Sequence, residues 1–187
     1  GTMGEITKTT RAYALPTQAQ PIALSTEFTY DSWGRMQQIV YPDGEVLDYV
    51  YDHGGQLKSM LGVKDGFSYN YLDSMSYDKF GAKTKMFYGN QMITNYMYNP
   101  VNLLLDSMAI CYQGMEYMTM GYEYDPKGNI TALYSTYDWF PGDIFMQEFT
   151  YDDADQLVNA TATSQNNPVY DNTIEYQNWG KIVNYTI

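Results

Sequence analysis

A short motif of tyrosine, aspartate and glycine recurs along this chain and constrains its fold more than any other feature. The clearest early copy lies in Glu27–Gly34, where Tyr30 and Asp31 are followed by a turn that Gly34 closes. Aromatic residues favour strands, and Asp and Gly supply the dihedral angles of tight turns. Anchor tyrosines in the same setting recur every 21 to 27 residues, at Tyr30, Tyr51, Tyr77, Tyr98, Tyr124, Tyr151 and Tyr176. The chain is therefore a repeat array.

The residues that follow each anchor tyrosine are predicted to form a corner between two strands. An aspartate comes next in five copies, at Asp31, Asp52, Asp78, Asp125 and Asp152. A glycine closes the turn at Gly34, Gly55, Gly81, Gly128 and Gly180. We expect the tyrosines to act as packing anchors and each aspartate to accept backbone N–H bonds within its own turn. The copies at Tyr98, Tyr151 and Tyr176 have lost some of these polar positions.

A second turn signal lies between each corner and the next anchor tyrosine. These signals are Pro42-Asp43-Gly44, Lys64-Asp65-Gly66, Gly89-Asn90, Gln113-Gly114, Pro141-Gly142-Asp143 and Asn166-Asn167-Pro168. Two strands per repeat predict an all-β fold, a repeat array of antiparallel β-hairpins forming a long, strongly twisted or curled sheet. The segment Val101–Cys111 is the best helix candidate, but its place in the repeat predicts a strand.

The repeats divide the chain into two parts. Residues 1–27 form an N-terminal segment with two possible strands, Ile6–Leu15 and Ile22–Phe28, and residues 28–187 hold the seven repeats. The first four residues, Gly1-Thr2-Met3-Gly4, look like a processed end rather than a natural start. At 187 residues, the chain is long enough for one domain with a substantial core.

The charge balance makes several classes of partner unexpected. The formal net charge is −12 and the pI is near 4.2, which argues against nucleic acid and against an anionic membrane surface. No apolar run approaches the roughly 20 residues of a membrane span, so we expect no membrane insertion, and no signal peptide is visible. Cys111 is the only cysteine, which excludes an internal disulfide and a cysteine metal cluster.

No catalytic constellation stands out, and we do not expect an enzyme. With 22 acidic residues, some carboxylate pair will reach a glycosidase-like separation by chance. Asp152, Asp153 and Asp155 place three oxygen donors close together, but they lack the glycine and distal glutamate of a helix-loop-helix calcium site. We therefore expect no metal and no cofactor.

The three tryptophans, Trp33, Trp139 and Trp179, are the candidates for ligand contacts. Trp33 and Trp179 occupy the same place, three residues after the anchor tyrosine and inside the turn. An exposed aromatic ring in a turn could stack on a sugar or hold a partner protein. Packing against the neighbouring repeat is the simpler interpretation of both.

These motifs resemble the RHS or YD-repeat family, whose pattern runs from a glycine through Tyr-x-Tyr-Asp to Gly-Arg-Leu. Gly44–Leu57 follows this pattern nearly throughout, Tyr30–Met36 has the glycine-arginine step, and Tyr122–Ile130 is a third good copy. The resemblance implies a β-sheet that spirals into a shell, as in bacterial polymorphic toxins, insecticidal toxin complexes and teneurins. Seven copies are too few for a closed shell, so we do not expect this chain alone to enclose a cargo.

The resemblance implies a non-catalytic structural or interaction module. We expect a fragment or short member of a bacterial RHS-type protein, cell-surface or toxin-associated, that is secreted or displayed and contacts a protein partner or flanking domains. The alternatives are a carbohydrate-binding module that binds a glycan through its tyrosines and tryptophans, and a degenerate hydrolase. Uncovered end strands, Ile174–Ile187 or the N-terminal segment, predict self-association.

Overall fold

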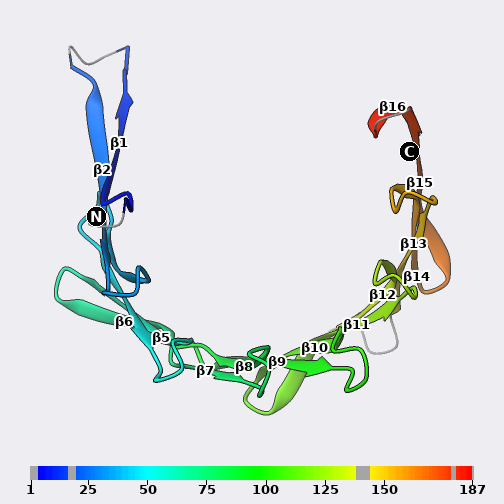
Figure 1. Cartoon of the computed structure of the whole chain (residues 1–187), viewed down its shortest axis with the longest axis horizontal. Helices are drawn as coiled ribbons and strands as arrows, with labels where there is room; N and C mark the ends of the chain where they lie inside the picture. Colours follow the sequence, from blue (N-terminus) through cyan, green and yellow to red (C-terminus); the bar gives the residue numbers. More distant parts are fainter. Residues whose placement is uncertain (1–3, 17–19, 138–143, 178–179, 187) are drawn as a thin grey trace. The chain divides into compact units, whose positions relative to one another are not determined.

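The computed structural model describes residues 4–16, 20–137, 144–177 and 180–186. These residues form strands and turns (Figure 1). This confirms the predicted all-β fold of antiparallel hairpins. No helix in the described residues is long and apolar enough to cross a membrane. The described strands are β1 (Lys8–Tyr13), β2 (Ile22–Tyr30), β3 (Met36–Val40), β4 (Val46–Tyr51), β5 (Leu57–Lys64), β6 (Phe67–Leu72), β7 (Ser74–Tyr77), β8 (Lys83–Phe87), β9 (Met92–Tyr98), β10 (Leu105–Tyr112), β11 (Met115–Tyr124), β12 (Ile130–Tyr137), β13 (Ile144–Tyr151), β14 (Leu157–Ser164), β15 (Asn167–Gln177) and β16 (Lys181–Thr186).

The strands fall into two compact units, Gly1–Gln91 and Met92–Ile187. The first unit contains a sheet in which β1 to β6 pair in chain order, and the hairpin of β7 and β8. The blue strands β1 and β2 of Figure 1 lie side by side and are the two strands expected in residues 1–27. In the second unit each strand from β9 to β16 pairs antiparallel with the next one.

The helix candidate Val101–Cys111 mostly lies in strand β10.

Some hairpins reverse through two residues that both have positive φ, as type I′ turns require. Asp65 and Gly66 have φ values of 51° and 81°, and Gln113 and Gly114 have values of 51° and 82°. The third such turn has φ values of 50° at Gln165 and 62° at Asn166. The turn predicted at Asn166-Asn167-Pro168 is therefore misplaced. Asn167 and Pro168 already belong to β15, where a register shift accommodates the proline opposite Thr163.

The Tyr-Asp corners use a longer loop, in which five residues separate the two strands and three of them lie between the aspartate and the residue whose carbonyl its N–H binds. At the first corner the Gly34 N–H donates to the Asp31 carbonyl over 3.0 Å, and the Asp31 N–H donates to the Arg35 carbonyl over 2.9 Å. Gly34 has a φ of 74°, as expected for a type I turn that ends in a left-handed residue. Equivalent backbone bonds occur at Asp52, Asp78, Asp125 and Asp152.

Two corners place a residue other than glycine in the left-handed conformation. Asp155 takes this position in the corner of Tyr151, with a φ of 59°. The corner after Tyr98 is one residue longer than its counterparts, because the Asn99 N–H donates to the Leu104 carbonyl. Its left-handed residue is therefore Leu103, with a φ of 61°. The spacing of the repeats did not reveal this extra residue.

The substantial core expected from the chain length does not form. Among the described residues, the buried apolar side chains are Leu47, Leu72, Ala132, Ala160 and Ala162. The strands of each unit run in a single layer, so most side chains on both faces stay half-buried or exposed. The stability of each unit must therefore depend heavily on strand pairing and on the corners.

Glycine conformation at one corner provides a direct test of this geometry. Gly128 has a φ of 95°, and a Cβ added there would meet open space, so Gly128→Ala strains the backbone without a clash. We expect it to lower the free energy of unfolding by about 1–2 kcal/mol. Gly121, in strand β11, has room for a Cβ and no positive φ, so Gly121→Ala should raise stability by about 0.5 kcal/mol. Urea denaturation of both variants measures the difference, and equal effects would contradict the assigned turn.

Candidate functional site

The carboxylate of each corner aspartate accepts backbone N–H bonds within its own turn. Asp78 Oδ1 is typical, because it accepts from the N–H groups of Phe80 and Ala82 at 2.8 and 2.9 Å. Asp31, Asp125 and Asp152 accept from the same two positions of their turns, at distances between 2.9 and 3.0 Å. Asp52 accepts from the Gln56 N–H at 2.9 Å. These bonds satisfy donors that the loop would otherwise leave unpaired.

Two corner aspartates have an additional side-chain partner, which stabilises the charged form. Arg35 binds Asp31 Oδ2 through Nη2 at 2.6 Å and Nε at 2.7 Å, and this hydrogen bonding holds the Asp31 pKa below its ordinary value. The Asn129 side chain donates to Asp125 Oδ2 at 2.9 Å and lowers the Asp125 pKa in the same way. Both charged carboxylates are therefore bound by side chains of their own turn.

Five anchor tyrosines bond through their hydroxyls to the part of the chain that precedes their repeat. The Tyr51 hydroxyl donates to the Met36 carbonyl at 2.7 Å, where the strand after the preceding corner begins. The other bonds of this kind are Tyr30 to Ile6 at 3.0 Å, Tyr77 to Leu57 at 2.8 Å, Tyr124 to Leu105 at 2.9 Å and Tyr151 to Ile130 at 2.8 Å. The acceptor of Tyr124 lies seven rather than six residues after its anchor, which matches the longer corner after Tyr98. In the four bonds between repeats, the hydroxyl thus reaches the first residue of the strand that follows the preceding corner.

In three corners, the residue that follows the residue of positive φ lies close to the corner of the next repeat. These residues are Arg35, Gln56 and Gln156. A Cβ added at Gly55 would lie 3.1 Å from Arg35 Nη1, and one at Gly81 would lie 3.1 Å from Gln56 Nε2. A Cβ at Gly180 would lie 2.8 Å from Gln156 Nε2. Glycine at these corners therefore provides space as well as a positive φ.

Where the next corner has Asp155 in place of glycine, the contact becomes a polar network. Asn129 Nδ2 donates to Asp155 Oδ1 at 3.1 Å, and Lys127 Nζ binds the same oxygen at 2.8 Å. The Lys127 hydrogen bond is the main reason that the Asp155 pKa lies below its ordinary value. The side chain that replaces glycine is thus held by the preceding corner.

The calcium alternative for Asp152, Asp153 and Asp155 finds no support in this geometry. Asp152 Oδ1 is used by its own turn, and Asp155 Oδ1 is bound by Lys127 and Asn129. No group of three His, Cys, Asp or Glu residues in the described part of the chain could hold a metal ion.

Trp33, the ligand-contact candidate that the structure describes, lies at the tip of the first corner. Its side chain is 69% exposed, and the Arg35 guanidinium lies 4.7 Å from its ring centroid. The same guanidinium lies 4.3 Å from the Tyr51 ring, so Arg35 contacts both aromatic rings as well as Asp31. The predictions for Trp139 and Trp179 concern residues outside the described part of the chain.

Phe80 is a second exposed aromatic tip, which the sequence did not single out. It stands three residues after Tyr77, as Trp33 does after Tyr30, and is 63% exposed. Lys79 Nζ lies 4.8 Å from its ring centroid. The sequence would have identified Phe80 if the residue three positions after every anchor tyrosine had been considered, and not only the tryptophans.

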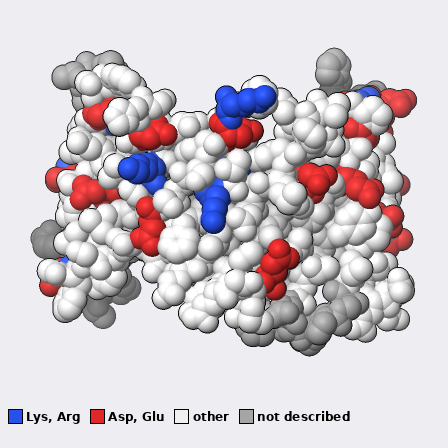
Figure 2. Space-filling view, turned by 90° about the horizontal axis from the view of Figure 1, so that it is seen from below, with Lys and Arg blue, Asp and Glu red and all other residues white. Residues whose placement is uncertain are grey.

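Charged side chains are sparse on the face of the molecule that Figure 2 shows. Figure 2 shows red acidic side chains scattered among uncharged ones, with fewer blue basic side chains. This distribution follows the net charge of −12. The described ion pairs join Lys8 to Glu27, Arg35 to Asp31, Lys64 to Asp43 and Lys127 to Asp155.

Solved structures with a similar fold include TcdB2-TccC3 chains and a Tc holotoxin pore. The chain aligns with a crystal structure of TcdB2-TccC3 at a TM-score of 0.70 and 18% identity, over 98% of this chain and 12% of that one. A crystal structure of TcdB2-TccC3-Cdc42 gives a TM-score of 0.67 and 19% identity, and the Tc holotoxin pore of Photorhabdus luminescens gives 0.67 and 18%. Each of these two alignments covers 96% of this chain and 12% of the other.

These similarities are structural. No family model matches the sequence, and no curated protein matches it. The chain spans about an eighth of the length of the solved chains. The comparison therefore shows a shared fold over a short part of much larger proteins.

Removing one anchor hydroxyl tests the bond between repeats. Tyr124→Phe deletes the donor to the Leu105 carbonyl, and we expect the free energy of unfolding to fall by about 1 kcal/mol. Tyr185, on β16, is 52% exposed, so Tyr185→Phe serves as the control and should leave stability nearly unchanged. Chemical denaturation of both proteins checks this, and equal losses would remove the special role of Tyr124.

High pH should destabilise the repeats. Burial raises the pKa of Tyr51, Tyr77, Tyr124 and Tyr151 above the ordinary value of 10.0. The neutral form of these tyrosines therefore contributes to the stability of the folded chain. Because the folded pKa exceeds the unfolded one, this contribution is fully present below pH about 10 and is lost as the pH rises through the folded pKa values. We expect a lower melting temperature at pH about 11 than at pH about 8. The absorbance of tyrosinate should rise together with unfolding, and full tyrosine ionisation in a folded chain would contradict this account.

Proposed function

We propose that this chain is a non-catalytic structural segment of an RHS or YD-repeat protein of a bacterial, toxin-associated type. The observation that carries the proposal is the bonding of four corners to the preceding repeat through the hydroxyls of Tyr51, Tyr77, Tyr124 and Tyr151. Such bonds hold successive hairpins at a fixed spacing, which is what a wall or scaffold requires. The similarity to Tc toxin chains supports the same role.

The exposed faces of the strands support a place within a larger polypeptide. A single layer of strands leaves large apolar side chains open, and such surfaces are usually covered by a partner. Phe67, Tyr69 and Tyr71 on β6 are 67%, 47% and 48% exposed, and Ile182 on β16 is 55% exposed. We therefore propose flanking domains or a second protein as the partner, in a secreted or surface-displayed assembly.

A catalytic role would need a reactive group that is free to act. The corner aspartates accept backbone bonds, and the hydroxyls of the anchor tyrosines donate to carbonyls, so both serve the fold. This supports the proposal that the segment is not an enzyme. It also removes the corner aspartates as a candidate pair for the degenerate-hydrolase alternative.

The structure of the whole natural polypeptide, by electron cryomicroscopy, tests the proposed function. We expect strands before β1 and after β16 to continue the repeat and to form a wall with this segment. The proposal fails if the segment forms a separate domain whose edge strands are covered by elements unrelated to the repeat.

Carbohydrate binding is the second candidate, because Trp33 presents an exposed ring at a corner tip. A glycan array probed with the whole chain should show a ligand that Trp33→Ala loses. Phe80→Ala removes a similarly exposed tip and serves as the control. Binding that persists in Trp33→Ala, or no binding at all, would exclude this candidate.

A further inference from the structure

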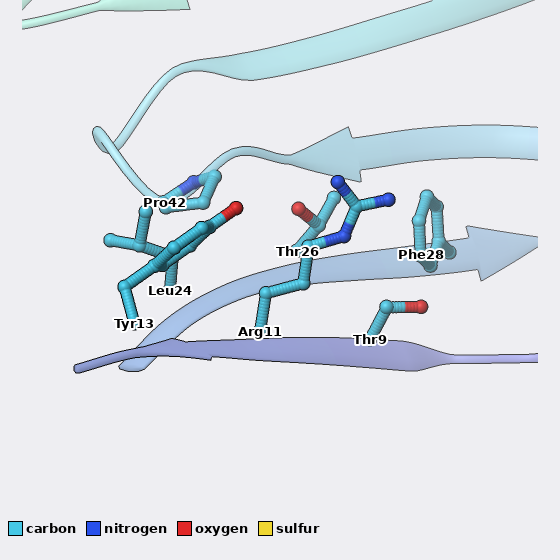
Figure 3. Close-up of a pocket in the computed structure, with 7 residues that line it drawn as sticks. All are labelled: Thr9, Arg11, Tyr13, Leu24, Thr26, Phe28 and Pro42. Carbon is cyan, nitrogen blue, oxygen red and sulfur yellow. The ribbon is translucent and has the colours of Figure 1, made fainter. Parts of the chain in front are cut away.

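A trough lies on one face of the β1–β2 hairpin. It has a volume of about 410 Å³ and is lined by Thr9, Arg11, Tyr13, Leu24, Thr26, Phe28 and Pro42. The alternation of strands explains the lining, because every second residue of β1 and of β2 points to the same face. Figure 3 shows Tyr13 and Leu24 next to Pro42, which comes from the turn between β3 and β4, and Thr9 and Phe28 at the other end of the trough.

Arg11 carries a charge that the described residues do not neutralise. The acidic residue nearest to it on β2 is Glu27, which lies opposite Lys8 in the register and pairs with Lys8 Nζ at 2.8 Å. The described ion pairs use Lys8, Arg35, Lys64 and Lys127, and none includes Arg11. The trough therefore presents an uncompensated guanidinium in a chain with a net charge of −12. By charge complementarity, its ligand is an anion.

The groups around Arg11 indicate what kind of anion fits. Figure 3 shows Thr9 and Thr26 beside Arg11, so their hydroxyls add donors near the guanidinium. Tyr13 and Leu24, which are 47% and 42% exposed, extend an apolar floor away from it toward Pro42. One end of the trough is thus polar and cationic, and the other is apolar.

The apolar part continues beyond Pro42. A second trough, of about 420 Å³, shares Leu24 and Pro42 with the first and adds Tyr41, Asp43 and Glu45. Its carboxylates already have partners, because Asp43 pairs with Lys64 at 2.7 Å and Glu45 accepts from the Tyr71 hydroxyl at 2.6 Å. The apolar part of a ligand can therefore extend over Leu24 and Pro42, and the ligand needs no second charged group.

We propose that this trough binds a small amphipathic carboxylate, with the carboxylate on Arg11 and the apolar body over Tyr13, Leu24 and Pro42. A strand added to the free edge of β1 would use backbone groups at that edge, whereas the trough lies on the face of the hairpin. A saccharide would need more hydrogen-bonding groups than Arg11 and two threonines supply. The site is separate from the corners and does not depend on the structural role proposed above.

Titration of the whole chain with 4-butylbenzoate, followed by heteronuclear NMR, tests the proposal. A ligand of this size is expected to bind with a Kd on the order of 1 mM and to shift the resonances of Thr9, Leu24 and Thr26. The amide 4-butylbenzamide has the same shape without the charge and should bind about tenfold more weakly or worse. Tri-glutamate and a galacturonic acid trisaccharide provide the anion without the apolar body and should bind more weakly than the benzoate.

Two substitutions separate the role of Arg11 from a general effect of charge. Arg11→Gln, at an exposed position, should weaken 4-butylbenzoate binding about tenfold or more while the far-ultraviolet spectrum stays unchanged. Lys58→Gln removes the same charge from an exposed residue that does not line the trough, and should leave the affinity unaltered. Unchanged binding in Arg11→Gln, equal binding of the amide, tighter binding of tri-glutamate or the trisaccharide, or no saturable binding would overturn the proposal.

Discussion

The bond between a corner aspartate and the backbone of its own turn is the interaction on which the rest of the structure depends. Each Tyr-Asp corner reverses the chain through the five residues between two strands, and a loop of this kind exposes N–H groups that no strand can pair. Asp78 satisfies two of them with a single oxygen. Because the turn is fixed, the tyrosine just before the aspartate points to one place in the preceding repeat, where its hydroxyl meets a carbonyl.

This arrangement explains how a chain with few buried apolar side chains can hold its shape. Leu47 and Leu72 are the buried apolar side chains among the described residues of the first unit. Hydrophobic burial therefore contributes less than in a two-layer domain, and ordered turns and inter-repeat hydrogen bonds contribute more. The same lack of a second layer leaves aromatic side chains such as Phe67 and Tyr69 exposed and available to a partner.

The repeat made most of the fold predictable from the sequence. The tyrosine spacing predicted hairpins, and the repeat position correctly placed a strand at β10 where the local pattern favoured a helix. Finer details were not accessible, because they depend on conformations that several residue types can adopt. Leu103 takes a positive φ without being Gly or Asn, and Gln165 begins a type I′ turn that the composition placed one residue later.

The candidate sites were less predictable than the fold. The turn aspartates and the position of Trp33 follow from local sequence. In contrast, the contact of Arg35 with Gly55 joins two repeats, and the trough around Arg11 needs two paired strands and the turn at Pro42. Neither can be derived from a motif, since each depends on the register between strands that lie apart in the sequence.

The most direct test of the central role of the aspartate compares two substitutions of Asp78. Asn99 holds its own corner through its side-chain oxygen, which accepts from the Val101 N–H at 2.9 Å, so an amide can replace the carboxylate. Asp78→Asn should therefore retain most of the free energy of unfolding, whereas Asp78→Ala should lose about 1–2 kcal/mol. Equal stabilities for the two variants, measured by urea denaturation, would contradict the account.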